Sequence, residues 1–150
     1  MPEPAIQIQS LTRKFGALTA IDNLNLEIPA GIIFGFLGPN GAGKTTTIRL
    51  LLGLLNPTSG NAKVLGFDTV SQGDEARTRC GALLEHTGLH KQLTAEDNLE
   101  FYGRVWNIPT QKRKARIQEL LSHMDLWERR SERIAKWSKG MKQKLALARA

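Results

Sequence analysis

A glycine-rich octapeptide carries the clearest chemistry in the sequence. It reads Gly38-Pro39-Asn40-Gly41-Ala42-Gly43-Lys44-Thr45 and matches the phosphate-binding loop pattern G-x-x-x-x-G-K-[ST]. Glycines allow the backbone to curl so that successive N–H groups point into one concavity, where they bind phosphate oxygens. A helix that starts near Gly43 would add the positive end of its dipole at the same place.

The last two residues of the loop would complete a nucleotide cradle. Lys44 can reach the β- and γ-phosphates, and the Thr45 hydroxyl can ligate Mg²⁺. A glycine-rich turn that matches by chance is the alternative. A buried strand is predicted before the loop and an amphipathic helix after it, which is the context that the mechanism requires. Kinases, GTPases and many ATPases share this loop, so it does not select among them.

Alternating apolar residues predict the elements that position the loop. Residues 5–11 and 17–28 alternate as strands do, and residues 32–37 form an apolar run typical of a strand buried on both faces. After the loop, one apolar helix face is formed by Ile48, Leu51, Leu52 and Leu55. Strands alternating with helices around a buried strand indicate an α/β sheet protein.

The pattern becomes helical from residue 93 onward. Thr94 is expected to cap a helix with an acidic first turn, and Pro109 is expected to end it. The apolar stripe of this helix is Leu99, Tyr102, Val105 and Trp106. The stripe of a second helix is Ile117, Leu120, Leu121 and Met124. We therefore expect a loop-bearing part at residues 1–92 and a helical part at residues 93–150.

Composition limits the classes of protein and leaves the partner open. The 150 residues carry a formal net charge of +7, which suits nucleotide, nucleic acid or acidic lipid without choosing among them. Cys80 is the only cysteine, which rules out an internal disulfide and fits a reducing compartment. Neither a secretory signal nor a run of about 18 apolar residues occurs, so a membrane role is expected to come through a partner.

One basic cluster is set apart from the loop. It consists of Lys112, Arg113, Lys114 and Arg116. We expect it to be a solvated helix face, and acidic lipid headgroups are the alternative partner. His86 and His90 are four residues apart, but no further Cys or His completes a set of metal ligands with them. We therefore do not expect them to bind a metal ion.

A second motif narrows the class of protein. The run from Trp137 to Gln143 precedes an apolar helix and resembles the Leu-Ser-Gly-Gly-Gln signature of ABC transporter ATP-binding subunits. Ser138 matches the signature serine and Gly140 its second glycine, whereas the residues at the other three positions depart: Trp137, Lys139 and Met141. In that family, the segment binds the γ-phosphate of ATP held by the opposite subunit. An ordinary serine cap is the alternative.

Other segments resemble the same family. Phe15 stands where the family places an aromatic ring that stacks on adenine; an interior Phe at a strand end is the alternative. Residues 54–60 resemble the link from the loop helix to the next strand, and residues 93–99 resemble the opening of the helical subdomain. Glu85 replaces the family's usual glutamine, which touches Mg²⁺ and the attacking water; a surface glutamate is the alternative. The closest pattern is that of bacterial drug and antibiotic exporters.

The resemblance implies a fold and a set of site residues. The fold is a P-loop ATPase core sheet with an antiparallel β region at the amino terminus and an inserted helical subdomain that ends in the signature helix. ATP would be bound by Phe15, Gly38, Pro39, Asn40, Gly41, Ala42, Gly43, Lys44, Thr45, Thr46, Ser138 and Gly140. Lys44, Glu85 and Ser138 would act in hydrolysis, and Thr45 and Glu85 would hold Mg²⁺.

The resemblance also implies partners. They are a second copy in a head-to-tail dimer and a membrane-spanning permease, at the cytoplasmic face of the cell membrane. No nucleic acid is expected. The alternative is a soluble ABC ATPase that acts on ribosomes or DNA.

Family elements that follow the signature are missing from these residues. They are the core strand that ends in a Mg²⁺-coordinating Asp and the catalytic Glu, and the switch His beyond it. We therefore expect residues 1–150 to belong to a longer protein. By themselves they are expected to bind nucleotide weakly and not to hydrolyse it.

Overall fold

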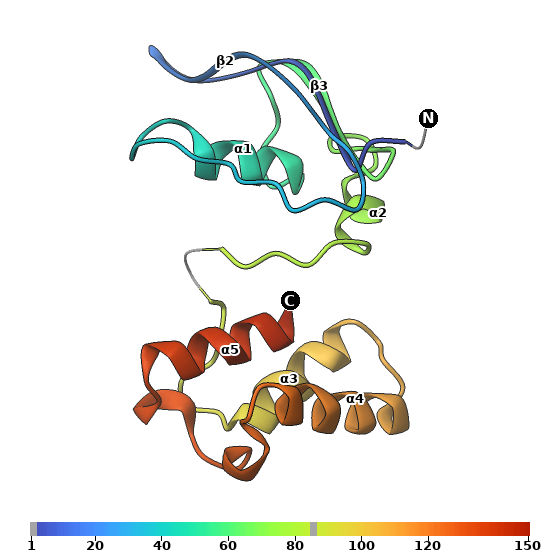
Figure 1. Cartoon of the computed structure of the whole chain (residues 1–150), viewed down its shortest axis with the longest axis vertical. Coiled ribbons are helices and arrows are strands. Elements are labelled where there is room, and N and C mark those ends of the chain that lie inside the picture. The colour runs from blue at the N-terminus through green and yellow to red at the C-terminus, as the bar shows by residue number, and fades with distance from the viewer. Residues whose placement is uncertain (1–2, 85–86) are drawn as a thin grey trace. The chain divides into compact units, whose positions relative to one another are not determined.

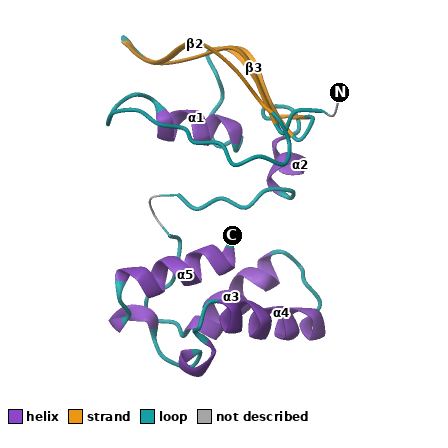
Figure 2. Ribbon diagram, viewed as in Figure 1, coloured by secondary structure: helices purple, strands orange, loops and turns teal. Residues whose placement is uncertain are grey.

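The computed structural model describes residues 3–84 and 87–150. The chain forms two compact units, Met1–Gly81 with all the strands of the described residues and Ala82–Ala150 with most of their helices (Figure 1, Figure 2). The predicted α/β class and antiparallel amino-terminal sheet are confirmed. The functional division placed after residue 92 remains a prediction. None of the helices in the described ranges combines the length and apolar character needed to span a bilayer.

Four strands form the sheet of the first unit. They are β1 (Ile6–Phe15), β2 (Leu18–Ile28), β3 (Ser59–Val64) and β4 (Phe67–Asp68), hydrogen-bonded in the order β2-β1-β3-β4. β1 pairs antiparallel with both β2 and β3. Its register with β2 runs from Ile6↔Ile28 to Phe15↔Leu18, so Phe15 and Leu18 stand together at the turn of the hairpin.

The helix α1 (Lys44–Leu51) packs on this sheet through a face that differs from the predicted one. Leu50 is buried with Ile8, Leu11, Ile21 and Ala62, whereas Ile48 is 40% exposed. The helix ends at Leu51 because Leu52 is its C-cap and Gly53 takes a positive φ. Leu52 and Leu55 of the predicted apolar face therefore lie beyond the end of the helix. Leu51 and Leu55 still pack at the edge of the cluster.

The apolar run at residues 32–37 is not the buried strand that the sequence predicts. Within the described ranges, no strand pairs with it, and a ladder needs a neighbour. Ile32, Phe34 and Phe36 line an apolar cavity of about 330 Å³ together with α1 residues, whereas Leu37 is 90% exposed. The run thus keeps an alternation of faces without the hydrogen bonds of a strand.

A short helix secures the end of α1. This helix, α2, spans Gly73–Arg77 and follows β4. The Nη1 atom of Arg77 donates a hydrogen bond of 2.9 Å to the Leu52 carbonyl. One of the carbonyls left free at the end of α1 is thereby satisfied.

The second unit is a small helical bundle. It contains α3 (Ala95–Val105), α4 (Thr110–His123), the short 3₁₀ helices η1 (Trp127–Arg129) and η2 (Ile134–Lys136), and α5 (Lys139–Arg149). The predicted cap is confirmed, since Thr94 Oγ1 accepts a 3.0 Å hydrogen bond from the Asp97 N–H. The core is made of Ala95, Leu99, Ile117, Leu121, Leu126, Ile134, Trp137, Leu145 and Ala148.

Two predictions about side-chain faces in this unit are wrong. Trp106 is the C-cap of α3, where the helix has ended. Its side chain is 55% exposed, and that of the neighbouring Val105 is 59% exposed. Arg113 is not part of a solvated basic face, because it is only 8% exposed. It precedes Ile117 and Leu121 by one and two helical steps of four residues, so it lies on the buried face of α4.

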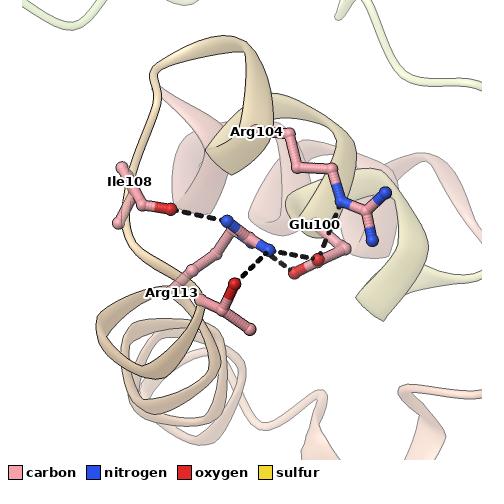
Figure 3. A network of polar contacts seen from close by, with 5 residues as sticks. Glu100, Arg104, Ile108 and Arg113 are labelled. Atoms are coloured by element: carbon pink, nitrogen blue, oxygen red, sulfur yellow. Dashed lines mark hydrogen bonds and ion pairs between the residues drawn. The ribbon is translucent and has the colours of Figure 1, made fainter.

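Arg113 is buried with its charge paired (Figure 3). Its Nε and Nη2 atoms donate to the two carboxylate oxygens of Glu100 on α3, each at 2.7 Å, and its Nη1 donates to the Ile108 carbonyl at 2.5 Å. Arg104 adds a third hydrogen bond to Glu100 at 3.0 Å. The network joins α3, α4 and the connection between them.

Candidate phosphate-binding site

The glycine-rich loop runs directly into the amino terminus of α1. Gly43 is the N-cap of that helix, and Gly41 and Gly43 both have φ of +85°. Side-chain-bearing residues rarely adopt this conformation. The Ala42 N–H bonds the Pro39 carbonyl at 3.3 Å, which closes the turn. The first N–H groups of α1, which have no partner inside the helix, therefore open beside the loop.

Gly43 also lies against the sheet. A Cβ atom at this position would stand 2.5 Å from the carbonyl oxygen of Ala20 on β2 and 3.3 Å from Ile21. A backbone carbonyl cannot move aside easily, so only glycine fits. This contact fixes the start of α1, and with it the loop, on the strand that follows Phe15 in the hairpin.

Lys44 folds back over the loop. Its Nζ atom donates hydrogen bonds of 2.6 Å to the carbonyls of Gly38 and Pro39. The ammonium charge is thus held at the loop instead of extending into solvent. A phosphate group bound there would meet this charge as well as the N–H groups of the helix terminus.

A cavity of about 360 Å³ joins the loop to the hairpin. Its lining residues are Phe15, Leu18, Thr19, Ala20, Asn40, Gly41, Gly43, Lys44, Thr45 and Thr46. One part of the wall is the loop and the start of α1, and the other is the end of the β1–β2 hairpin. Phe15 is 43% exposed and contributes the only aromatic ring among these lining residues. The structure therefore brings Phe15 and the loop residues, 25 or more positions apart in sequence, to one cavity.

Sequence reasoning did not identify Leu18, Thr19 and Ala20 as part of this cavity. Their signal was the hairpin itself, because a tight turn after Phe15 must bring the first residues of the returning strand back beside it. Gly38 and Pro39 enter the site through the carbonyls that hold Lys44.

Ser138 and Gly140 belong to the second unit. Ser138 is the N-cap of α5, and its Oγ accepts a hydrogen bond of 3.2 Å from the Met141 N–H. The serine cap, the alternative to a phosphate role, is therefore present, and the role of Ser138 at a phosphate stays a prediction. Lys139 and Gly140 are exposed beside it. Trp137, the first departure from the signature, is a core residue at 4% exposure, and its Nε1 donates to Glu132 at 3.1 Å.

The residues available for a metal ion are few. Glu85 lies outside the described residues. In the described parts of the chain, no group of three or more His, Cys, Asp or Glu side chains comes together. Thr45 lines the cavity, and its hydroxyl is a hard oxygen donor of the kind that Mg²⁺ accepts. Mg²⁺ commonly takes one or two protein oxygens with the rest from phosphates and water, so this donor set fits.

Comparisons with known proteins match this chain over both the glycine-rich loop and the helical unit. The family profile described as ABC transporter matches residues 21–150. A daunorubicin resistance ATP-binding protein, DrrA3 of Streptomyces coeruleorubidus, is 37% identical over 148 residues, which are 99% of this chain and 47% of that protein. The bacitracin transport ATP-binding protein BcrA of Bacillus licheniformis is 40% identical over 97% of this chain and 46% of its own length.

A third relative and a solved structure extend the comparison. The ABC transporter ATP-binding protein NatA of Bacillus subtilis is 42% identical over 87% of this chain and 54% of its own length. The solved structure of an ATP-binding subunit of an ABC transporter superposes with a TM-score of 0.83 at 27% identity, covering 97% of this chain and 61% of that one. The chain thus spans about half the length of the curated relatives it matches. With a family match over most of its length, this chain belongs to the ABC transporter family.

Proposed function

We propose that this chain is the nucleotide-binding part of an ATPase subunit that drives a membrane partner. The observation that carries the proposal is the cavity shared by the glycine-rich loop and Phe15. A phosphate cradle at one wall and an aromatic ring at the other suit the two ends of ATP. Stacking requires only a flat ring, and Phe15 supplies one with an exposed surface.

Lys44, Thr45 and the start of α1 each have a role in this proposal. The N–H groups at the start of α1 bind the β- and γ-phosphates, and Lys44 exchanges its loop carbonyls for phosphate oxygens. Thr45, together with Glu85, would hold Mg²⁺. When bound, that ion neutralises part of the phosphate charge. Thr46 lines the cavity beside them.

The complete site would need a second copy of the subunit. Ser138 and Gly140 at the start of α5 would meet the γ-phosphate held by the other copy in a head-to-tail dimer. The support is the exposed start of that helix, whose free N–H groups attract anions. Hydrolysis in the full-length protein would then depend on Lys44, Glu85 and Ser138 together.

The membrane partner is proposed from the relatives. Two of them are named for daunorubicin resistance and for bacitracin transport. We propose that the full-length protein likewise supports export of a substrate, through a permease, at the cytoplasmic face of the membrane. Residues 1–150 by themselves would bind nucleotide weakly and would not hydrolyse it. The exposed apolar run at residues 32–37 supports this, because no strand of residues 3–84 or 87–150 pairs with the segment that leads into the loop.

Calorimetry of nucleotide binding tests the proposal. In the full-length protein, Lys44→Ala should weaken MgATP binding at least about tenfold, because a charge-assisted contact to phosphate is lost. Lys63→Ala is the matched control, since Lys63 is an exposed lysine on β3 of the same unit and does not line the cavity. Equal affinity in the wild type and Lys44→Ala would refute the assignment of the loop.

The two other proposed elements need their own experiments. Glu85→Gln should keep ATP binding and change turnover by less than about tenfold, because both side chains offer a Mg²⁺ ligand oxygen of similar placement. Complete loss of hydrolysis would instead make Glu85 a catalytic carboxylate. Affinity purification of the tagged protein should recover a membrane permease; recovery of ribosomes or DNA would favour the soluble alternative.

A further inference from the structure

We propose that Arg13 is a positioning residue for the base end of the nucleotide site, acting through Phe15. The inference rests on the proposed function, since it concerns how that site would hold a nucleobase. Arg13 and Phe15 are two residues apart on β1 and so share one face of the strand. The guanidinium carbon of Arg13 lies 4.5 Å from the centroid of the Phe15 ring.

The guanidinium of Arg13 lies over one face of the Phe15 ring. Phe15 lines the cavity, whereas Arg13 is not among the described residues that do. A cation over the face of an aromatic ring at this distance is an attractive contact. The ring therefore has one face covered by a planar cation, and the nucleobase is assigned to its other face.

Arg13 is itself fixed from a third place in the fold. Its Nη1 atom donates a hydrogen bond of 2.8 Å to the carbonyl of Asn56, which lies between α1 and β3. The next residue on β1 is tied to the same connection, because the Lys14 N–H bonds Thr58 Oγ1 at 3.0 Å. The Arg13 Nε atom is buried and has no hydrogen-bond partner among the described residues, so this part of the guanidinium is packed against the protein.

Through these contacts Arg13 can position the Phe15 ring, which its positive charge by itself would not do. Phe15 is a partly exposed ring at the turn of a hairpin. Arg13 contacts the Phe15 ring and is itself hydrogen-bonded to Asn56, which follows the helix that begins at the loop. We infer that this link fixes the position of the ring relative to the loop. Removing Arg13 should therefore affect recognition of the base and leave recognition of the phosphates intact.

The test compares ATP with inorganic tripolyphosphate, which has the phosphates and no base. Both are titrated into the full-length protein in calorimetry, and the ratio of the two affinities measures the contribution of the base. Arg13→Gln should lower this ratio about two- to fivefold, the size of an exposed cation–π contact. Its tripolyphosphate affinity should stay as in the wild type. Lys14→Gln removes the same charge from the neighbouring residue and should leave the ratio unchanged.

A double-mutant cycle separates positioning from general damage. In a Phe15→Ala background, Arg13→Gln should have no further effect on the ratio, because the ring through which it acts is gone. An unchanged ratio in Arg13→Gln, or an equal effect with and without Phe15, would overturn the inference. If Lys44→Ala failed to weaken either ligand, the loop assignment itself would be wrong, which is a different outcome. The variant Arg13→Lys keeps the charge without the planar group and should fall between Arg13→Gln and wild type.

Discussion

Arg113 of α4 holds both carboxylate oxygens of Glu100 on α3, with two nitrogen–oxygen distances of 2.7 Å. The hydrogen bonds from Arg113 are the main reason that the pKa of Glu100 falls from 4.5 to about 2, against the raising effect of burial. Arg104 adds to the lowering. A pair with this geometry joins two helices through one charge contact, and losing either partner would leave the other charge uncompensated.

This pair predicts a specific pH dependence. Because the folded-state pKa of Glu100 is depressed, its stabilising contribution is complete above about pH 4.5 and is lost as the pH falls towards about 2. Glu100→Gln should unfold at a lower temperature than the wild type at pH 7, by at least about 5 °C. The gap between the two should narrow as the pH is lowered through that window. A gap that stays constant between about pH 5 and 2.5 would contradict the assignment.

Gly103 makes room for the same arginine. A Cβ atom at Gly103 would meet Arg113 Cδ and, at 2.7 Å, Cγ. Replacing a glycine inside a helix by alanine ordinarily gains about 0.5–1 kcal/mol. Here Gly103→Ala should destabilise, because the stem of Arg113 is held at its far end by Glu100. Urea unfolding in an Arg113→Ala background checks the cause, since there the substitution should become neutral or stabilising.

Two glycines of the phosphate loop should respond differently to the same change. Gly41 and Gly43 share a φ of +85°, so alanine would cost about 1–2 kcal/mol of backbone strain at either position. Only at Gly43 would the new Cβ meet a backbone carbonyl, that of Ala20. Gly43→Ala should therefore lower the melting temperature more than Gly41→Ala, and only Gly43→Ala should lift α1 from β2. Equal melting temperatures would count against this contact.

Local signals explain which elements the sequence could predict. The caps Thr94 and Ser138 and the buried pair Ile117 and Leu121 depend on neighbours within one or two helical turns. Such information lies in the sequence itself. The loop at residues 38–45 was predictable for the same reason, because its glycines and Lys44 act through their own backbone and adjacent carbonyls.

Long-range contacts account for the failures. Residues 32–37 have the composition of a buried strand, yet a strand exists only where another chain segment supplies its hydrogen bonds. Arg113 looked like one member of a basic run, and its burial depends on Glu100, 13 positions away on another helix. The contact of Arg13 with Phe15 could be suspected from their alternation, but the anchor at Asn56 could not.

The start of α5 allows the structural role of Ser138 to be separated from its proposed role at phosphate. Aspartate, asparagine and serine are about equally good N-caps, so Ser138→Asp and Ser138→Asn should keep the hydrogen bond to the Met141 N–H and melt within about 2 °C of the wild type. Only aspartate brings a negative charge to the place proposed for the γ-phosphate of the other copy. In the full-length protein, Ser138→Asp should abolish ATP-dependent dimer formation, measured by light scattering with and without ATP, while Ser138→Asn retains part of it. If both variants form dimers equally well, Ser138 is only a helix cap.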